Sequence, residues 1–141
     1  YSRIAHNKKI IAVTGTNGKS TTTKLISDIL SQNDIPNFMG GNIGIPLLDF
    51  PIKHNNLRHH VIELSSYQLE SFKKFNPYIS ILLNISQDHL DRYKNFKENI
   101  FQKEKLIISN RKGYKIICID DNDSAALVHY TINTFATDTT P

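Results

Sequence analysis

The stretch that decides the fold is VTGTNGKSTTT, residues Val13–Thr23. A glycine-containing turn that ends in Lys-Ser is typical of a loop that wraps a phosphate group. A full P-loop follows the pattern G-x-x-x-x-G-K-[ST], however, and counting back from Gly18 puts Val13 where the first glycine belongs. The stretch is therefore either a nucleotide site of a variant kind or a chance run of small residues.

The residues on either side of this turn predict a strand before it and a helix after it. The apolar run KKIIAVTG, residues 8–15, is typical of a buried parallel strand. Lys19–Gln32 has helical spacing, with Leu25, Ile29 and Leu30 near one face.

A strand, a glycine-containing turn and a helix in this order favour phosphate binding. Backbone N–H groups of the turn and the helix dipole can hold phosphate oxygens. Lys19 would reach the terminal phosphates, and Ser20 would offer its hydroxyl to Mg²⁺. The alternative is a plain turn capped by Thr16 or Asn17, which leaves Lys19 unexplained.

The composition is that of a soluble globular protein large enough for one domain. The chain has 141 residues, of which 39% are hydrophobic and 21% charged. Its formal net charge of +4 comes from dispersed lysines and arginines, so we do not expect nucleic acid as a partner. No apolar run is long enough to span a bilayer, so we do not expect a membrane either. The single cysteine, Cys118, fits a reducing compartment such as the cytoplasm.

The rest of the chain alternates apolar and helical patterns. This alternation predicts an α/β fold of three layers, with a mostly parallel sheet covered by helices on both faces, like the P-loop NTPases. Residues 33–37 read as a turn, and the three glycines and proline of 38–46 predict a shaped loop. We expect further strands at 59–66, 78–86 and 114–120, and helices at 95–109, where Asn95 and Glu98 form a capping box, and 124–130.

Two polar groups follow predicted strands, at the edge of a parallel sheet where ligands bind. Glu63 lies towards the C-terminal end of the strand at 59–66 and is a candidate second ligand to the Mg²⁺ of Ser20. Taken without the other motifs, a carboxylate at this position is better explained by a salt bridge at the edge of the sheet. His89 lies beside two carboxylates. In proteins generally, such a cluster is more often a hydrogen-bonded polar loop than a metal site. Its position on the same rim favours a functional role; the cluster is Asp88, His89, Asp91 and Arg92.

Other candidates give weaker signals. Lys103 falls near the apolar face of the helix predicted at 95–109, where a snorkelling lysine is the better explanation, whereas Lys105 points more outward. Asn42 is a possible side-chain donor in the glycine-rich loop. Cys118 is expected to be buried and inert, and the other histidines to be structural; these are His6, His54, His59, His60 and His129.

Together, the motifs TGTNGKST, GGNIG, ELSSYQLE and NISQDHLDRY resemble the Mur ligases, which use ATP to add amino acids to the peptidoglycan precursor. They are similar to the D-glutamate-adding members in particular. The family's P-loop does not require the first glycine, so Val13 is no objection. The resemblance covers nearly the whole chain, in order.

The resemblance implies roles for individual residues. Ser20 and Glu63 would bind the Mg²⁺ at the ATP phosphates. His89 and a carbamylated lysine, Lys103 with Lys105 as runner-up, would hold a second ion. Asn42 and Ser65 would contact the muramoyl substrate. The ATP phosphates would be held by Gly15, Thr16, Asn17, Gly18, Lys19, Ser20 and Thr21.

The implied reaction joins D-glutamate to UDP-N-acetylmuramoyl-L-alanine through an acyl phosphate. Family members have three domains, and residues 1–141 correspond to the central ATP-binding one, incomplete at its C-terminal end. The UDP-binding and C-terminal domains, if present as separate chains, would be partners. We therefore expect the 141 residues alone to be inactive as a ligase; the alternative is a truncated nucleotide-binding module without turnover.

Overall fold

The fold was examined in a computed structural model. It describes residues 8–47, 49, 56–72, 75–85, 103, 105–108, 110 and 112–120. A parallel sheet forms the middle layer, with the strand order β2-β3-β1-β4-β5 and every neighbouring pair parallel. The strands are β1 (Lys9–Thr14), β2 (Asn37–Gly41), β3 (His59–Glu63), β4 (Ile79–Leu82) and β5 (Tyr114–Ile117).

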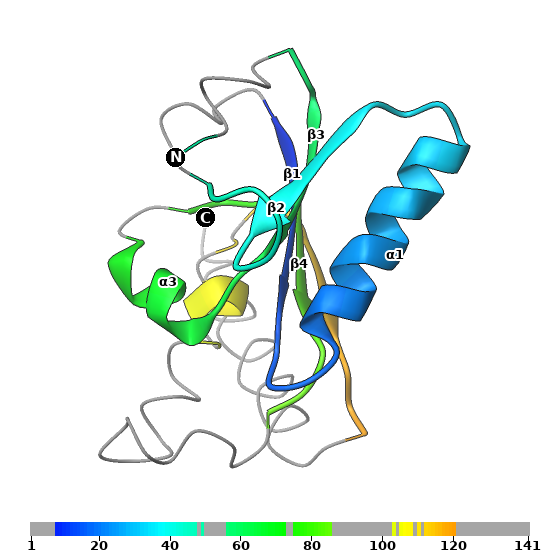
Figure 1. The fold of residues 1–141 in the computed structure, drawn as a ribbon. Coiled ribbons are helices and arrows are strands. Elements are labelled where there is room, and N and C mark those ends of the chain that lie inside the picture. The colour runs from blue at the N-terminus through cyan, green and yellow to red at the C-terminus, as the bar shows by residue number, and fades with distance from the viewer. Residues whose placement is uncertain are drawn as a thin grey trace, which may run out of the picture.

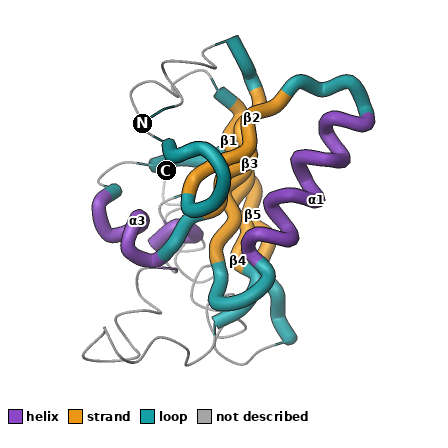
Figure 2. Tube along the Cα trace, in the orientation of Figure 1, coloured by secondary structure: helices purple, strands orange, loops and turns teal. Residues whose placement is uncertain are grey.

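Helices cover both faces of this sheet. Helix α1 (Lys19–Gln32) packs against β1, β2 and β3 on one face. Helix α3 (Ser66–Ser71) lies on the other face, with the helical residues 105–108 beside it (Figures 1 and 2). Since the step from β1 to β2 runs opposite to the step from β3 to β4 along the sheet, right-handed crossovers place α1 and α3 on opposite faces. The predicted three-layer α/β fold is confirmed.

The main hydrophobic core lies between the sheet and α3, on the face of the sheet that α3 covers. Alternate residues of the central strands point into it, which is why Ile10 and Ala12 of β1 share it with Ile62 of β3. A smaller cluster of Leu82, Ile85 and Ile107 continues the core towards β5. The main cluster contains Ile10, Ala12, Phe38, Leu47, Ile62, Leu64, Leu69, Phe75 and Leu106.

Helix α1 has the predicted bounds but a different inward face. Leu25 and Ile29 are more than half exposed, at 57% and 51%. The inward stripe is Thr23, which is fully buried, with the half-buried Ile26 and Leu30 at spacings of three and four residues. The prediction for Leu30 holds, and that for the other two is wrong.

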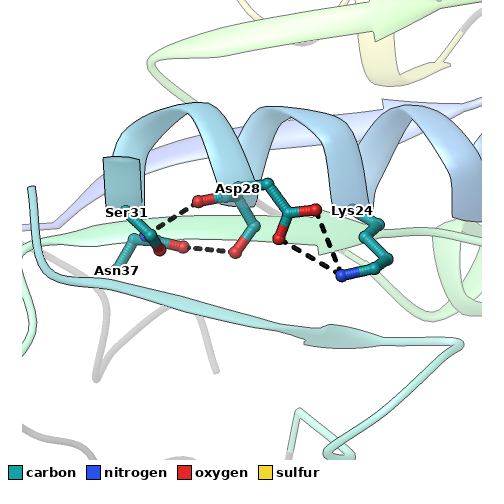
Figure 3. Close-up of polar contacts among 5 residues, drawn as sticks. Lys24, Asp28, Ser31 and Asn37 are labelled. Atoms are coloured by element: carbon teal, nitrogen blue, oxygen red, sulfur yellow. Dashed lines mark hydrogen bonds and ion pairs between the residues drawn. The ribbon is translucent and has the colours of Figure 1, made fainter. Parts of the chain in front are cut away.

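Polar side chains join α1 to the strand that follows it (Figure 3). Asn37, at the start of β2, accepts a hydrogen bond of 2.7 Å from Ser27 Oγ and donates one of 3.0 Å to Ser31 Oγ. On the exposed surface of the same helix, Lys24 and Asp28 form an ion pair of 3.1 Å, four residues apart.

The glycine-rich segment at 38–46 contains a strand that the sequence analysis did not predict. Residues 37–41 form β2 and pair in parallel with β3 along their whole length. Gly41 has a φ of 114°, and a Cβ there would lie 2.2 Å from the Glu63 carbonyl oxygen, so the close approach of the two strands requires glycine. Gly41 thus serves strand contact, whereas Gly44 lies in the bend that follows β2.

The other boundaries shift modestly. The strand predicted at 59–66 ends at Glu63, because Ser65 caps α3 and forms a capping box with Gln68. Helical residues within the predicted helix at 95–109 are described at Lys103 and 105–108. The caps Asn95 and Glu98, and the helix predicted at 124–130, lie outside the described residues.

Candidate nucleotide site

The turn after β1 carries the geometry of a phosphate-binding loop. Gly18 has a φ of 80°, a left-handed conformation that lets α1 begin at Lys19 directly after the turn. The first N–H groups of a helix have no partner within it, and those at the start of α1 therefore favour a bound anion. Lys19 folds back over the loop, and its Nζ donates to the Thr16 carbonyl oxygen at 2.7 Å.

The position of Val13 explains why the first glycine of the usual pattern is not needed. Val13 is fully buried within β1 and is aligned with Glu63 of β3 and Ile81 of β4. The strand continues through Thr14, so the loop opens only at Gly15. The side chain of residue 13 therefore packs in the protein interior and does not enter the turn.

Glu63 lies beside the loop as predicted and is held by two neutral donors. Ser20 Oγ donates to its Oε2 at 2.8 Å, and Asn42 Nδ2 donates to its Oε1 at 2.9 Å. The Asn42 N–H also donates to the Glu63 carbonyl oxygen at 3.0 Å. Sequence-distant ends of α1, β2 and β3 thus meet at one carboxylate.

The surroundings of Glu63 fit a hard divalent cation. Its side chain is 1% exposed, and within the described part of the chain no lysine or arginine forms an ion pair with it. A buried carboxylate without a compensating cation is costly. Carboxylate and hydroxyl oxygens suit Mg²⁺, which keeps several of its waters and needs few protein ligands. Among the described residues, no group of three or more His, Cys, Asp or Glu lies close enough together to hold a metal ion.

The two candidate lysines lie in different places. Lys103 is 3% exposed, and its Nζ donates to Thr16 Oγ1 at 2.8 Å, which brings its amine to the phosphate loop. Lys105 Nζ instead donates to the carbonyl oxygens of Leu69 and Glu70 in α3, at 3.3 and 3.4 Å. The structure therefore brings Lys103, rather than Lys105, to the loop.

Other predicted residues have structural partners or lie outside the described part. Ser65 caps α3: its Oγ accepts from the Gln68 N–H at 3.4 Å, and its own N–H donates to Gln68 Oε1 at 3.0 Å. His89, with Asp88, Asp91 and Arg92, lies outside the described residues.

One residue at the loop was missed. Asn84 follows β4, and its side chain accepts from the Thr16 and Asn17 N–H groups. The strand predicted at 78–86 had enclosed Asn84, whereas β4 ends at Leu82 and leaves Asn84 on the rim where ligands were expected.

The burial of His60 in β3 agrees with a structural role, whereas Cys118 does not match its prediction. His60 is fully buried beside Phe38, close to the Leu57 carbonyl oxygen at 3.1 Å, and burial lowers its pKa to about 4. Cys118 is only partly buried, because it lies just beyond the end of the outer strand β5, with Sγ 3.8 Å from Asp120 Oδ2. The expectation of a buried cysteine is wrong.

Fold and loop together define a class: an α/β domain of the P-loop type, with a lysine and a hydroxyl opening α1 and a carboxylate on the neighbouring strand. Residues 13–140 match the family model of the Mur ligase middle domain. The chain belongs to this family.

Relatives of known function narrow the comparison. A UDP-N-acetylmuramoylalanine–D-glutamate ligase of Rickettsia prowazekii is 44% identical over 117 residues, which are 82% of this chain and 26% of the relative. The enzyme of the same name from Geotalea daltonii is 40% identical over 113 residues, or 79% of this chain and 25% of the relative. The predicted similarity to the D-glutamate-adding members is confirmed, and the chain spans about a quarter of their length.

Solved structures agree on the fold. A UDP-N-acetylmuramoyl-L-alanyl-D-glutamate–2,6-diaminopimelate ligase superposes with a TM-score of 0.73 at 23% identity, covering 89% of this chain and 30% of the other. The MurF ligase of Thermotoga maritima, solved in complex with ADP, gives a TM-score of 0.71 at 19% identity, with 94% and 34% covered. In the part of the chain that is described, no helix is long and apolar enough to cross a membrane.

Proposed function

We propose that this chain forms the ATP- and Mg²⁺-binding part of a ligase that joins D-glutamate to UDP-N-acetylmuramoyl-L-alanine during peptidoglycan precursor synthesis. One observation carries the proposal: Lys19 and Ser20 open α1 next to the buried carboxylate of Glu63. The identity of the substrates is inferred from the relatives named as D-glutamate ligases, which are 40% and 44% identical to this chain.

In the proposed reaction, the L-alanyl carboxylate attacks the γ-phosphorus of ATP, so that an acyl phosphate forms and ADP leaves. The amino group of D-glutamate then attacks the acyl carbon, inorganic phosphate leaves, and the amine loses a proton. Both reactants of the first step are anions, so their approach needs positive charge. Lys19 and the N–H groups at the start of α1 supply it on the phosphate side.

Ser20 and Glu63 are the residues that would hold Mg²⁺. When bound, the ion neutralises phosphate charge and orients the phosphate oxygens. Asn42 holds one oxygen of Glu63, which leaves the carboxylate in a fixed orientation. Asn42 and Ser65 would also contact the muramoyl substrate.

The proposal assigns a second ion to His89 and a carbamylated Lys103. Carbamylation replaces an ammonium by an anionic oxygen donor, which a hard cation prefers. The contact between Lys103 Nζ and Thr16 Oγ1 supports this choice, because it puts the amine beside the loop that would bind the phosphates.

A second candidate function is a nucleotide-binding module without ligase turnover. It needs only the residues described at the loop, Lys19, Ser20 and Glu63, and no bound amino acid. In both cases the 141 residues would act as the middle domain, and a UDP-binding and a C-terminal domain would be needed for ligation.

The test is calorimetric titration of the 141-residue chain with ADP and Mg²⁺. Lys19→Ala should weaken binding by about 1.5–3 kcal/mol, since it removes a charge-assisted phosphate contact. Lys24→Ala is the matched control, because Lys24 lies on the exposed side of the same helix and pairs with Asp28. Equal affinity in wild type and Lys19→Ala would contradict the proposal.

A further inference from the structure

Asn84 connects the end of β4 to the phosphate loop through its side chain. Its Oδ1 accepts from the Thr16 N–H at 3.0 Å and from the Asn17 N–H at 2.8 Å. Its Nδ2 donates to the Asn17 carbonyl oxygen at 3.1 Å. One side chain therefore satisfies three backbone groups of a loop that lies 67 residues earlier in the sequence.

The backbone of the same segment supports this contact. The Thr16 N–H also points to the Asn84 carbonyl oxygen at 3.0 Å, and the Leu83 N–H donates to the Thr14 carbonyl oxygen at 3.0 Å. A Cβ at Gly15 would lie 3.1 Å from Leu83 Cβ, so loop and segment are in close contact. Asn84 thus acts on a loop that is already pressed against the end of β4.

The three side-chain bonds involve the part of the loop that must keep its shape. Thr16 receives both amines at the site: its carbonyl oxygen accepts from Lys19, and its hydroxyl accepts from Lys103. If the peptide groups at 16 and 17 rotate, both contacts move with them. Fixing a binding loop in its bound shape before the ligand arrives raises affinity, because less freedom is lost on binding.

We propose that Asn84 is a positioning residue for the phosphate loop, holding the peptide groups of Thr16 and Asn17 in the shape that receives a nucleotide. The proposal rests on the proposed function, since it assumes that this loop binds phosphate. It assigns Asn84 no contact with the nucleotide and no part in the chemistry.

The experiment compares Asn84→Ala with Asn110→Ala in the 141-residue chain. Asn110 is a matched control, because it too makes three hydrogen bonds, to Ser80 Oγ, the Tyr114 carbonyl oxygen and the Gly113 N–H. It lies by the first residue of β5, at the opposite end of the sheet from the loop. Both variants should lose stability, which is followed by urea unfolding.

Two readouts separate positioning from stability. Amide hydrogen exchange without nucleotide should be slow at Asn17 in wild type and fast in Asn84→Ala, whereas the Thr16 N–H keeps its bond to the backbone carbonyl oxygen of residue 84. Affinity for ADP with Mg²⁺ should fall about tenfold or more in Asn84→Ala. Asn110→Ala should leave both unchanged. Asn84→Asp keeps the oxygen acceptor and should restore slow exchange at Asn17.

Each result has a distinct meaning. Fast exchange at Asn17 in wild type, or equal ADP affinity in Asn84→Ala and wild type, overturns the positioning role. If Asn84→Ala does not fold, amide exchange in wild type and in Asn84→Asp provides the test. Fast exchange at Asn17 in folded Asn84→Asp overturns the proposal. If the wild-type chain does not bind ADP with Mg²⁺, the proposed function is overturned instead. Slow amide exchange in the loop would not change that conclusion.

Discussion

At the scale of single residues, Lys103 and Lys105 offer a direct comparison, since they are two positions apart but contact different elements. Lys103 Nζ reaches Thr16 in the phosphate loop, whereas Lys105 Nζ contacts carbonyl oxygens of α3. We predict that Lys103 is the carbamylated lysine and that Lys103→Ala strongly lowers activity in the full-length ligase, with Lys105→Ala close to wild type.

Carbamylation can be detected without any activity. With ¹³C-labelled bicarbonate and Mg²⁺, the carbamate carbon should give an NMR signal in wild type and in Lys105→Ala, and none in Lys103→Ala. A signal that disappears only in Lys105→Ala would show that the assignment is two residues off. Full activity in both variants would end the carbamate hypothesis for this protein.

His60 should make the fold sensitive to acid. Burial lowers its pKa in the folded chain from 6.5 to about 4, so the unfolded chain binds more protons between these values. Stability is therefore full above pH 6.5, falls as the pH drops towards 4, and has lost this contribution below that, on the order of 2–3 kcal/mol.

The measurement is urea unfolding of wild type and His60→Leu at pH 7.5 and at pH 4.5. The variant loses the contact with Leu57 at both pH values, but it should lose less further stability on acidification than wild type does. An identical drop in both proteins would rule out His60 as a source of acid sensitivity.

At the scale of elements, β2 depends on a close approach that only glycine allows. Gly41 has a positive φ, and its added Cβ would meet the Glu63 carbonyl oxygen at 2.2 Å. We predict that Gly41→Ala lowers the free energy of unfolding by more than about 3 kcal/mol, because backbone strain and a clash with backbone add.

Gly44 provides the matched control for this substitution. Its φ of 65° is also positive, but the nearest atom to its added Cβ is the Met39 carbonyl oxygen at 3.8 Å. Gly44→Ala should therefore cost only about 1–2 kcal/mol, from backbone strain alone. If urea unfolding gives the same loss for both variants, the clash with β3 is not what selects glycine in β2.

The elements also show what the sequence can and cannot predict. The start of α1 was predictable, because a glycine turn followed by helical spacing is a local signal. Strand β2 was not, because its two glycines count against a strand and its stability comes from pairing with β3. Likewise, the spacing that pointed to Leu25 and Ile29 says little about which side of α1 meets the sheet.

The site follows the same division. The meeting of Ser20 with Glu63 was predictable, since carboxyl ends of parallel strands share one edge of the sheet. The contacts of Asn84 were not, because an asparagine carries no signature for a partner 67 residues away. Sequence patterns thus indicated that Ser20 and Glu63 lie at one edge of the sheet, and the structure adds the Asn84 side chain bonded to the loop beside them.

At the scale of the whole molecule, the question is how much of ligation these 141 residues can perform. They span about a quarter of the D-glutamate ligases that they resemble. The described site contains the residues proposed to bind phosphate and a cation, whereas ligation also requires a carboxylate and an amine held in register. Such positioning can contribute roughly 7–11 kcal/mol to a reaction between bound substrates.

We therefore predict that the purified 141-residue chain binds ADP with Mg²⁺ but does not ligate D-glutamate. The assay follows ADP release from ATP with UDP-N-acetylmuramoyl-L-alanine present, with and without D-glutamate, and the binding titration shows that the chain is folded. Release should not depend on D-glutamate. A D-glutamate-dependent release that Lys19→Ala abolishes would show that the 141 residues alone bring the substrates together, and the middle domain would then be a complete catalyst.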